Sequence, residues 1–119
     1  MARSAPGVYL RLEMGEVEIR TEATIDAPPA AVWAALTDFA GFRDWNPMVF
    51  EAEGAATVGS VVTLRYRSSV GLPLRFEVRI TRADAERELR WLGTRLGVAG
   101  DHYFRLGEDG GGTRLVHGE

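Results

Sequence analysis

The sequence predicts an α+β domain in which one curved antiparallel sheet carries two short helices after its first strand. Three observations support this fold class. Residues 17–26 alternate strictly between apolar and polar positions, residues 28–44 begin with two prolines and have a helical pattern, and the rest of the chain divides into about six alternating segments. A sheet with only one apolar face is typical of antiparallel pairing, because parallel strands are buried on both faces.

The first strand is expected over Val17–Asp26, where odd positions are apolar or small and even positions are mostly charged. Residues 8–14 alternate as well, but Gly15 shifts their phase. They therefore form either a separate short strand or an extension of the first strand through a bulge. Residues 1–14 as a whole are accordingly expected to be an extra strand or a flexible extension.

The helical region follows at once. The Pro28-Pro29 pair fits the first turn of a helix, where backbone N–H groups have no partner within the helix. Residues 30–37 are rich in alanine and present one apolar face. Asp38 can cap a second short helix over residues 39–44. The Asn46-Pro47 pair disfavours further helix and favours a strand after it.

The remaining strands alternate in the same way and are joined by short turns. They are expected near residues 48–53, 61–68, 74–81, 88–92, 101–106 and 113–119. Alternation places apolar side chains on one inner face, at Leu64, Leu74, Phe76, Val78, Trp91, Phe104 and Leu115. Arg65, Arg75 and Arg79 have the opposite parity and are expected to point to solvent.

Composition excludes several classes of function. The chain has no cysteine and no lysine, so disulfide scaffolds, thiol catalysis, thiolate metal sites and Schiff-base chemistry are ruled out. All 14 basic residues are arginine, yet the net charge is -3, which disfavours binding to nucleic acid. No window approaches the ~18 apolar residues of a membrane span. Arg11 and Glu13 interrupt any signal-peptide core, so a cytoplasmic protein is expected.

Four segments in order carry a family resemblance: IDAPPAAVWAALTDFAGFRDWNPMV, ELRWLG, GDHYFRL and GGTRLVHGE. Together they resemble the START-like polyketide cyclase/dehydrase superfamily, also called SRPBCC, and within it a bacterial branch with Trp-Asn-Pro after the helix pair. The resemblance spans about residues 17–119, so residues 1–119 are expected to form a single domain. It implies a helix-grip fold of about six to seven strands, whose sheet wraps a long C-terminal helix and leaves a cavity for an apolar ligand.

In that family the strand ending like HGE is followed by the long helix, whereas the sequence stops at Glu119. The resemblance therefore implies a domain that lacks its C-terminal helix, with an incomplete cavity and an uncovered inner face. Leaving apolar side chains wet costs about 1.5–3 kcal/mol for each one. We expect the face to be covered by a second copy of the chain, by residues 1–14 folded across it, or by a bound partner.

The two histidines are the most informative polar residues. His102 shares a strand face with Phe104, and His117 shares one with Leu115. If these strands form a hairpin that buries their apolar residues together, both histidines point to the inner face, with ring centres within about 8 Å. Three interpretations stay open: polar groups that orient a ligand carbonyl or hydroxyl, structural histidines, and a His-His-Glu metal site or acid–base pair that includes Glu119. The spacing matches no recognised metal motif, and no metal is expected.

Aromatic side chains form the second candidate site. Each belongs either to the core or to a cavity wall. The wall is favoured for Trp45, because the resemblance places the cavity mouth just after the helix pair. The complete set of expected ligand-binding residues is Trp45, Tyr66, Phe76, Trp91, His102, Phe104 and His117.

The resemblance implies binding or transport of a small apolar ligand, lipid-like or polyketide-like, in the sheet-lined cavity. One alternative is an enzyme of the cyclase, dehydratase or aromatase type, in which His102 and His117 serve as acid and base. Another is a protein-interaction module similar to the Hsp90-activator-like branch of the superfamily. No cofactor is expected, and a homodimer through the uncovered face is the simplest protein partner.

Overall fold

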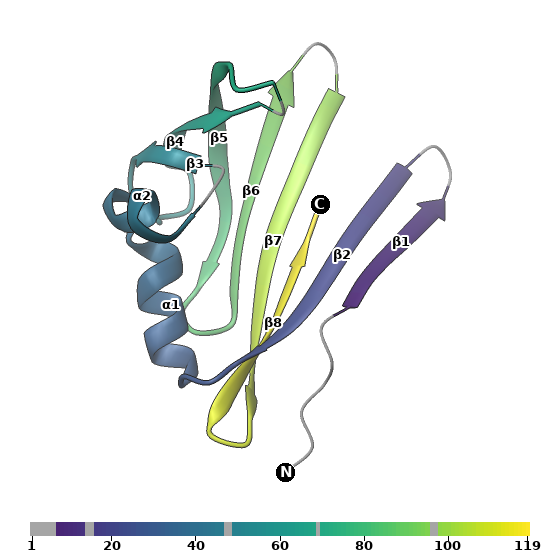
Figure 1. Ribbon diagram of the computed structural model, residues 1–119, viewed down its shortest axis with the longest axis vertical. Coiled ribbons are helices and arrows are strands. Elements are labelled where there is room, and N and C mark those ends of the chain that lie inside the picture. Colours follow the sequence, from purple (N-terminus) through teal and green to yellow (C-terminus); the bar gives the residue numbers. More distant parts are fainter. Residues whose placement is uncertain (1–6, 14–15, 47–48, 69, 96–97) are drawn as a thin grey trace.

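The structure is a computed structural model that describes residues 7–13, 16–46, 49–68, 70–95 and 98–119. Eight antiparallel strands form one curved sheet in the order β1-β2-β8-β7-β6-β5-β4-β3, and the helices lie between β2 and β3 in the chain (Figure 1). The elements are β1 (Gly7–Glu13), β2 (Glu16–Ile25), α1 (Pro29–Thr37), the 3-10 turn η1 (Phe39–Gly41), α2 (Phe42–Trp45), β3 (Val49–Glu53), β4 (Val61–Arg67), β5 (Pro73–Asp84), β6 (Glu88–Arg95), β7 (Val98–Asp109) and β8 (Gly112–Gly118). This confirms the expected α+β helix-grip architecture.

The sheet has one strand more than the six to seven that the resemblance implies, because the segment expected to be an extra strand or an extension forms β1. It pairs with β2 from Gly7 opposite Glu22 to Glu13 opposite Glu16. A separate strand is therefore the correct alternative for this segment. The expectation that residues 1–14 fold across the inner face is wrong for β1, because its backbone hydrogen bonds extend the sheet at its edge.

Some expected features fall outside the described residues. Gly15, which shifts the phase of the alternation, is one of them, as are Pro47 of the Trp-Asn-Pro motif and Met48 at the start of an expected strand. The strand itself is observed as β3, starting at Val49.

The helices begin where the prolines and Asp38 predict. The Pro28 carbonyl accepts hydrogen bonds from the N–H groups of Ala31 (3.0 Å) and Val32 (3.2 Å) at the start of α1. The expected second helix is split, because Gly41 N–H donates both to the Asp38 carbonyl (3.1 Å) and to its carboxylate (3.2 Å) and tightens the first turn into η1. Among the described residues, no helix is long and apolar enough to cross a membrane.

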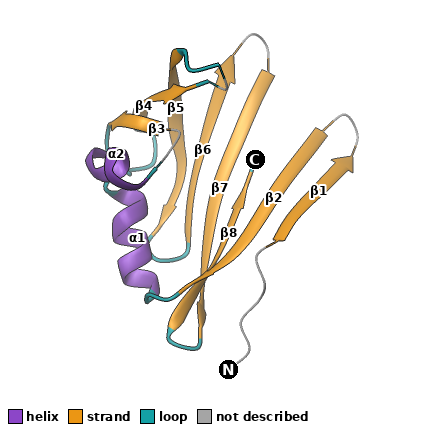
Figure 2. Cartoon of the chain, in the orientation of Figure 1, coloured by secondary structure: helices purple, strands orange, loops and turns teal. Residues whose placement is uncertain are grey.

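The helices pack on one face of the sheet, which we term the inner face (Figure 2). The core there consists of Val32, Leu36, Phe39, Phe42, Ala52, Val62, Leu64, Val78, Ile80, Leu89 and Trp91. The expectation of an uncovered inner face is wrong in part, because Leu64, Val78 and Trp91 are buried together with the helices. The rest of that row is half-buried: Leu74, Phe76, Phe104 and Leu115.

The opposite, outer face is charged. Arg65, Arg75 and Arg79 are exposed there, as their parity predicts. This face also contains an ion pair between Glu88 and Arg105, which the sequence pattern did not predict. Glu88 is buried, and one of its carboxylate oxygens accepts a 2.7 Å hydrogen bond from Nε of Arg105.

Tyr103 is a second buried group on the outer face. Its ring lies against Gly118 on β8, where any Cβ atom would collide with it. Its hydroxyl donates a 3.2 Å hydrogen bond to Glu18, and the guanidinium groups of Arg105 and Arg90 lie 4.3 and 5.2 Å from the ring centre. Burial raises the pKa of Tyr103, and the Glu18 carboxylate raises it further.

Candidate functional site

The two histidines lie side by side on the inner face. Their ring centres are 6.1 Å apart, which confirms the predicted proximity. β7 and β8 pair with Phe104 opposite His117, so His102 is a diagonal neighbour of His117 and not its direct partner. The rings of Phe104 and His117 stack at 4.4 Å with planes 5° apart. Alternation along two adjacent strands is sufficient to produce this arrangement.

His117 is a partly enclosed imidazole whose surroundings favour its neutral form. Burial lowers its pKa below 6.5, and the neighbouring His102 lowers it further, whereas Glu119 acts in the opposite direction. Nε2 of His117 is buried and has no hydrogen-bond partner among the described residues. Buried ring nitrogens normally have a partner, so this atom is a free hydrogen-bonding position within aromatic surroundings.

His102 has a carboxylate partner. Its Nε2 atom lies 3.1 Å from Oε2 of Glu119, and both side chains are partly exposed. A carboxylate at this distance fixes the orientation of an imidazole. The inner face thus has one imidazole paired to an acid and one without a partner, next to each other.

Trp91 completes an aromatic group around these histidines. Its ring centre is 6.0 Å from that of His102 and 5.2 Å from that of Phe104. We term Trp91, His102, Phe104 and His117 the histidine cluster. Four of the expected ligand-binding residues are therefore brought together on β6, β7 and β8.

Tyr66 and Phe76 lie apart from this cluster, on β4 and β5. Their rings stack at 5.0 Å with planes 2° apart. Both side chains are half-buried. They form a separate aromatic pair nearer the other edge of the sheet.

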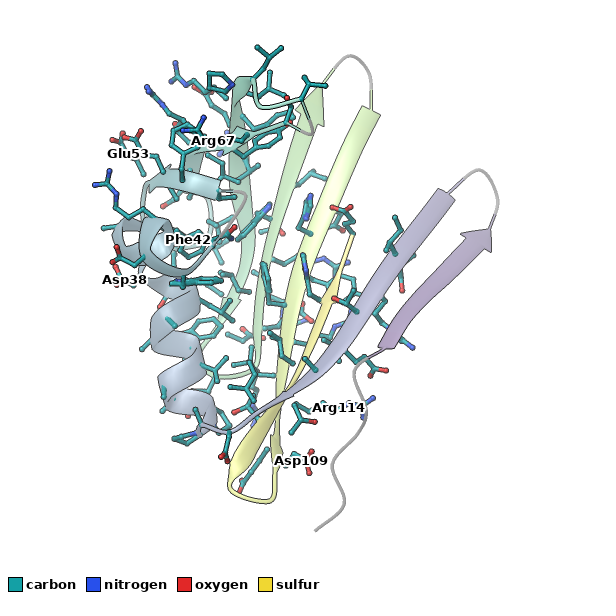
Figure 3. The ribbon with its side chains drawn as sticks, viewed as in Figure 1. Asp38, Phe42, Glu53, Arg67, Asp109 and Arg114 are labelled. Atoms are coloured by element: carbon teal, nitrogen blue, oxygen red, sulfur yellow. The ribbon has the colours of Figure 1, made fainter. Side chains whose placement is uncertain are left out.

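Trp45 belongs to a third location. It is exposed and packs edge to face on Phe42, with ring centres 4.9 Å apart, and Phe42 points from α2 towards the sheet (Figure 3). Trp45 borders an apolar hollow of about 260 Å³ between α1 and the sheet. The hollow is lined by Ile25, Ala27, Ala31, Val32, Ala35, Leu36, Trp45 and Leu115.

Of the residues that line this hollow, the sequence predicted only Trp45 as a ligand-binding residue. Ala31 and Ala35 are four residues apart on α1, which is a signal for one small, apolar helix face, and Ala27 precedes the helix. Ile25 ends β2 just before the helix, whereas Leu115 lies far away in the sequence and reaches α1 through the pairing of β2 with β8. Leu115 precedes His117 by two residues on the same strand face, so the hollow and the histidine cluster adjoin along β8.

A metal site finds no geometric support. Within the part of the chain that the structure describes, no three His, Cys, Asp or Glu side chains come together in a way that could hold a metal ion. His102 therefore lies between the other two groups: its ring is next to that of His117, and its Nε2 atom contacts the carboxylate of Glu119.

Comparison with known protein families identifies the family of this chain. The profile of the family described as "Polyketide cyclase / dehydrase and lipid transport" matches residues 16–117. The chain belongs to this family. The superfamily resemblance of the sequence segments is thereby confirmed. No curated protein matches the sequence significantly.

Solved structures of the same fold are numerous. CalU16 from Micromonospora echinospora is 23% identical in its crystal structure, with a TM-score of 0.71, over 96% of this chain and 66% of CalU16. Its solution structure is 25% identical, with a TM-score of 0.70, over 99% of this chain and 63% of CalU16. An Aha1 dimer from Colwellia psychrerythraea is 21% identical, with a TM-score of 0.68, over 87% of this chain and 75% of that one. The chain therefore spans less than two thirds of the length of CalU16.

Proposed function

We propose that this member of the family binds a small apolar ligand, lipid-like or polyketide-like, on the inner face of its sheet. The observation that carries the proposal is the position of His117. Its unpartnered nitrogen lies among aromatic rings, two residues along β8 from the apolar hollow that Leu115 lines. A mostly apolar site with one convergent polar group is the usual composition of a small-molecule site.

The proposed ligand lies along β8 from the hollow to the histidine cluster. Its apolar body packs on α1 and Leu115, and a hydroxyl or carbonyl group at one end reaches the nitrogen of His117. Trp45 lines the hollow, and Trp91 belongs to the histidine cluster. Tyr66 and Phe76 would contact only a ligand long enough to extend towards β4 and β5.

Two substitutions on one helix test the hollow. Ala35 lines it and Ala34 does not, although both are exposed residues of α1. Ala35→Leu should fill the hollow and weaken binding of naphthalene, measured by quenching of tryptophan emission. Ala34→Leu should leave binding unchanged. Equal binding by the two variants would contradict the proposed location.

A second measurement tests the polar contact. Naphthol differs from naphthalene by one hydroxyl, and a neutral hydrogen bond contributes about 1 kcal/mol, or roughly fivefold in affinity. The wild-type protein should prefer naphthol by this factor. His117→Phe should abolish the preference while naphthalene binding is kept. A preference that survives the substitution would place the hydroxyl elsewhere.

Catalysis is a second candidate, favoured by the 3.1 Å contact between His102 and Glu119 beside a neutral imidazole. Such a group can donate a proton at one ring and accept one at the other, as cyclisation with loss of water requires. A short poly-β-ketone thioester should then lose water and gain ultraviolet absorbance in the presence of the protein. His102→Gln and Glu119→Gln should stop this reaction but retain naphthalene binding.

Self-association is the protein partnership that we propose for the inner face. Its half-buried row and exposed Trp45 leave apolar surface that a second copy can cover. The Aha1 relative was solved as a dimer. Light scattering should find a dimer without ligand, and naphthol should shift it towards monomer if both use the same face.

A further inference from the structure

The hairpin between β4 and β5 has an unusually apolar tip. We term Val70, Gly71 and Leu72 the β4–β5 tip; it projects from one end of the sheet (Figure 1). Val70 is 77% exposed, the highest value for a large apolar residue in the described part of the chain, and Leu72 is 60% exposed. Hairpin tips are ordinarily polar, so two exposed aliphatic residues at one tip indicate a contact surface.

The tip is held in shape by its own hydrogen bonds. Ser68 N–H donates to the Leu72 carbonyl at 2.9 Å, and Gly71 N–H donates to the Ser68 carbonyl at 2.9 Å. The Ser68 hydroxyl accepts a further bond from Leu72 N–H at 3.2 Å. Gly71 has a φ of +83°, which glycine adopts without strain. Because the turn is closed internally, the two aliphatic side chains are presented outward.

Arginines surround the base of the tip. Arg65 and Arg75 are direct partners in the register of β4 and β5, an arrangement of like charges that costs stability. Arg67 follows on the same face of β4, nearest the tip, and its guanidinium lies 5.1 Å from the ring centre of Phe50 (Figure 3). Arg65 and Arg75 border a hollow of about 280 Å³ beside Pro73.

Two of these arginines form long ion pairs with nearby glutamates. Glu51 lies 3.7 Å from Arg65, and Glu77 lies 3.4 Å from Arg75, with all four side chains well exposed. Exposed ion pairs of this kind contribute little to stability, so the arginines can exchange these glutamates for other anions. Three arginines against two glutamates leave the base of the tip with a net positive charge, although the whole chain carries -3.

We propose that the β4–β5 tip docks on an anionic lipid bilayer. Val70 and Leu72 enter the interface between headgroups and acyl chains, and Arg65, Arg67 and Arg75 contact headgroup phosphates. A bilayer fits better than a protein partner, because two aliphatic side chains on a narrow convex turn need a surface that deforms around them. Apolar insertion combined with nearby basic residues is how peripheral proteins bind such surfaces.

The placement of the tip suits exchange with a membrane. β8 runs parallel to β4 in this sheet, so its end with His117 lies towards the same end of the sheet as the tip. Docking would turn that end of the inner face towards the lipid. The proposal goes beyond ligand binding and is tested without any ligand, so either proposal can fail alone.

The test is flotation of the protein with vesicles made of equal parts phosphatidylcholine and phosphatidylglycerol, with pure phosphatidylcholine vesicles for comparison. Val70→Ser combined with Leu72→Ser should reduce binding to the anionic vesicles by roughly tenfold or more, since apolar burial is lost. Val58→Ser is the matched control, because Val58 is a 62% exposed valine in the loop before β4 and should not matter.

Charge is tested in the same assay. Arg67→Gln with Arg75→Gln should weaken binding to the anionic vesicles, and added salt should do the same to the wild type. Arg87→Gln, an exposed arginine in the β5–β6 turn, should have no effect. The proposal is overturned if the anionic vesicles do not bind, if pure phosphatidylcholine binds equally, or if the tip variants bind like wild type. It is also overturned if the tip serines change only the self-association seen by light scattering.

Discussion

Replacing Gly118 by alanine should destabilise the fold far more than a glycine-to-alanine change normally does. A Cβ atom there would lie 2.5 Å from Cε1 of Tyr103 and closer still to Cζ and the hydroxyl oxygen. Carbon atoms pack at about 3.5–4.0 Å, so the ring must move by about 1 Å or more. That movement disturbs the hydrogen bond to Glu18 and the packing of Arg105 on the ring.

The expected size follows from these contacts. Overpacking costs about 1–3 kcal/mol and a weakened hydrogen bond about 1 kcal/mol, against a gain of about 0.4–1 kcal/mol from restricting the unfolded chain. Gly118→Ala should therefore lower the free energy of unfolding by about 2–3 kcal/mol, which is a fall in Tm of roughly 10 °C or more for a domain of this size. Thermal melts and urea titrations measure both quantities.

Two comparisons isolate the cause. Gly107→Ala on β7 is the control, because no atom lies within 4 Å of a Cβ there, and it should be neutral or slightly stabilising. In a Tyr103→Ala background, Gly118→Ala should cost little, since the ring that it strikes is gone. If Gly118→Ala melts like wild type, or if its cost is the same with and without the Tyr103 ring, the reasoning is refuted.

Three further predictions concern buried polar groups. Thr113 is 0% exposed, and its hydroxyl donates a hydrogen bond to the Ala27 carbonyl at 2.7 Å. Thr113→Val should therefore lower the free energy of unfolding, measured in urea, by about 1–3 kcal/mol. Thr113→Ser should keep the bond and lose less, and equal losses by the two variants would contradict this. Glu88→Gln should lower the free energy of unfolding by about 1–2 kcal/mol, because Arg105 loses its charged acceptor. This loss should become smaller at high salt, which screens the charge. A loss that does not change with salt would show that packing, and not charge, is responsible. Burial lowers the pKa of His117, so below pH 6.5 the unfolded chain takes up a proton that the folded chain does not. Stability should then fall as pH falls from 6.5 to the lower folded value, and His117→Phe should flatten this slope in urea titrations; an unaltered slope would assign it to other groups.

Alternation along strands was the part of the structure that the sequence could predict best. It placed the strands from β4 to β8, and it brought His102 and His117 to one face without any knowledge of their exact register. Parity alone is enough for that, because a shift of two residues leaves both side chains on the same face.

Features that depend on contacts between distant segments could not be predicted in this way. The apolar hollow needs α1 to meet Leu115, and burial of Tyr103 needs Gly118 opposite it on another strand. Glu88 has the parity of an exposed residue and is buried only because arginines from neighbouring strands cover it. Such groupings arise from sheet order, which local pattern does not specify.

The position of β2 in the sheet has a consequence for how the chain folds. β2 is made early in synthesis, yet its inner neighbour is β8, and Thr21 donates a hydrogen bond to the His117 carbonyl across 96 residues. Until β8 emerges from the ribosome, the β1–β2 hairpin has no sheet to join and both of its outer edges are unpaired. Pairing at such a separation closes a very long loop, which makes folding slow. A nascent chain would therefore carry exposed strand edges throughout most of its synthesis, and chaperone dependence should be greatest just before β8 is complete.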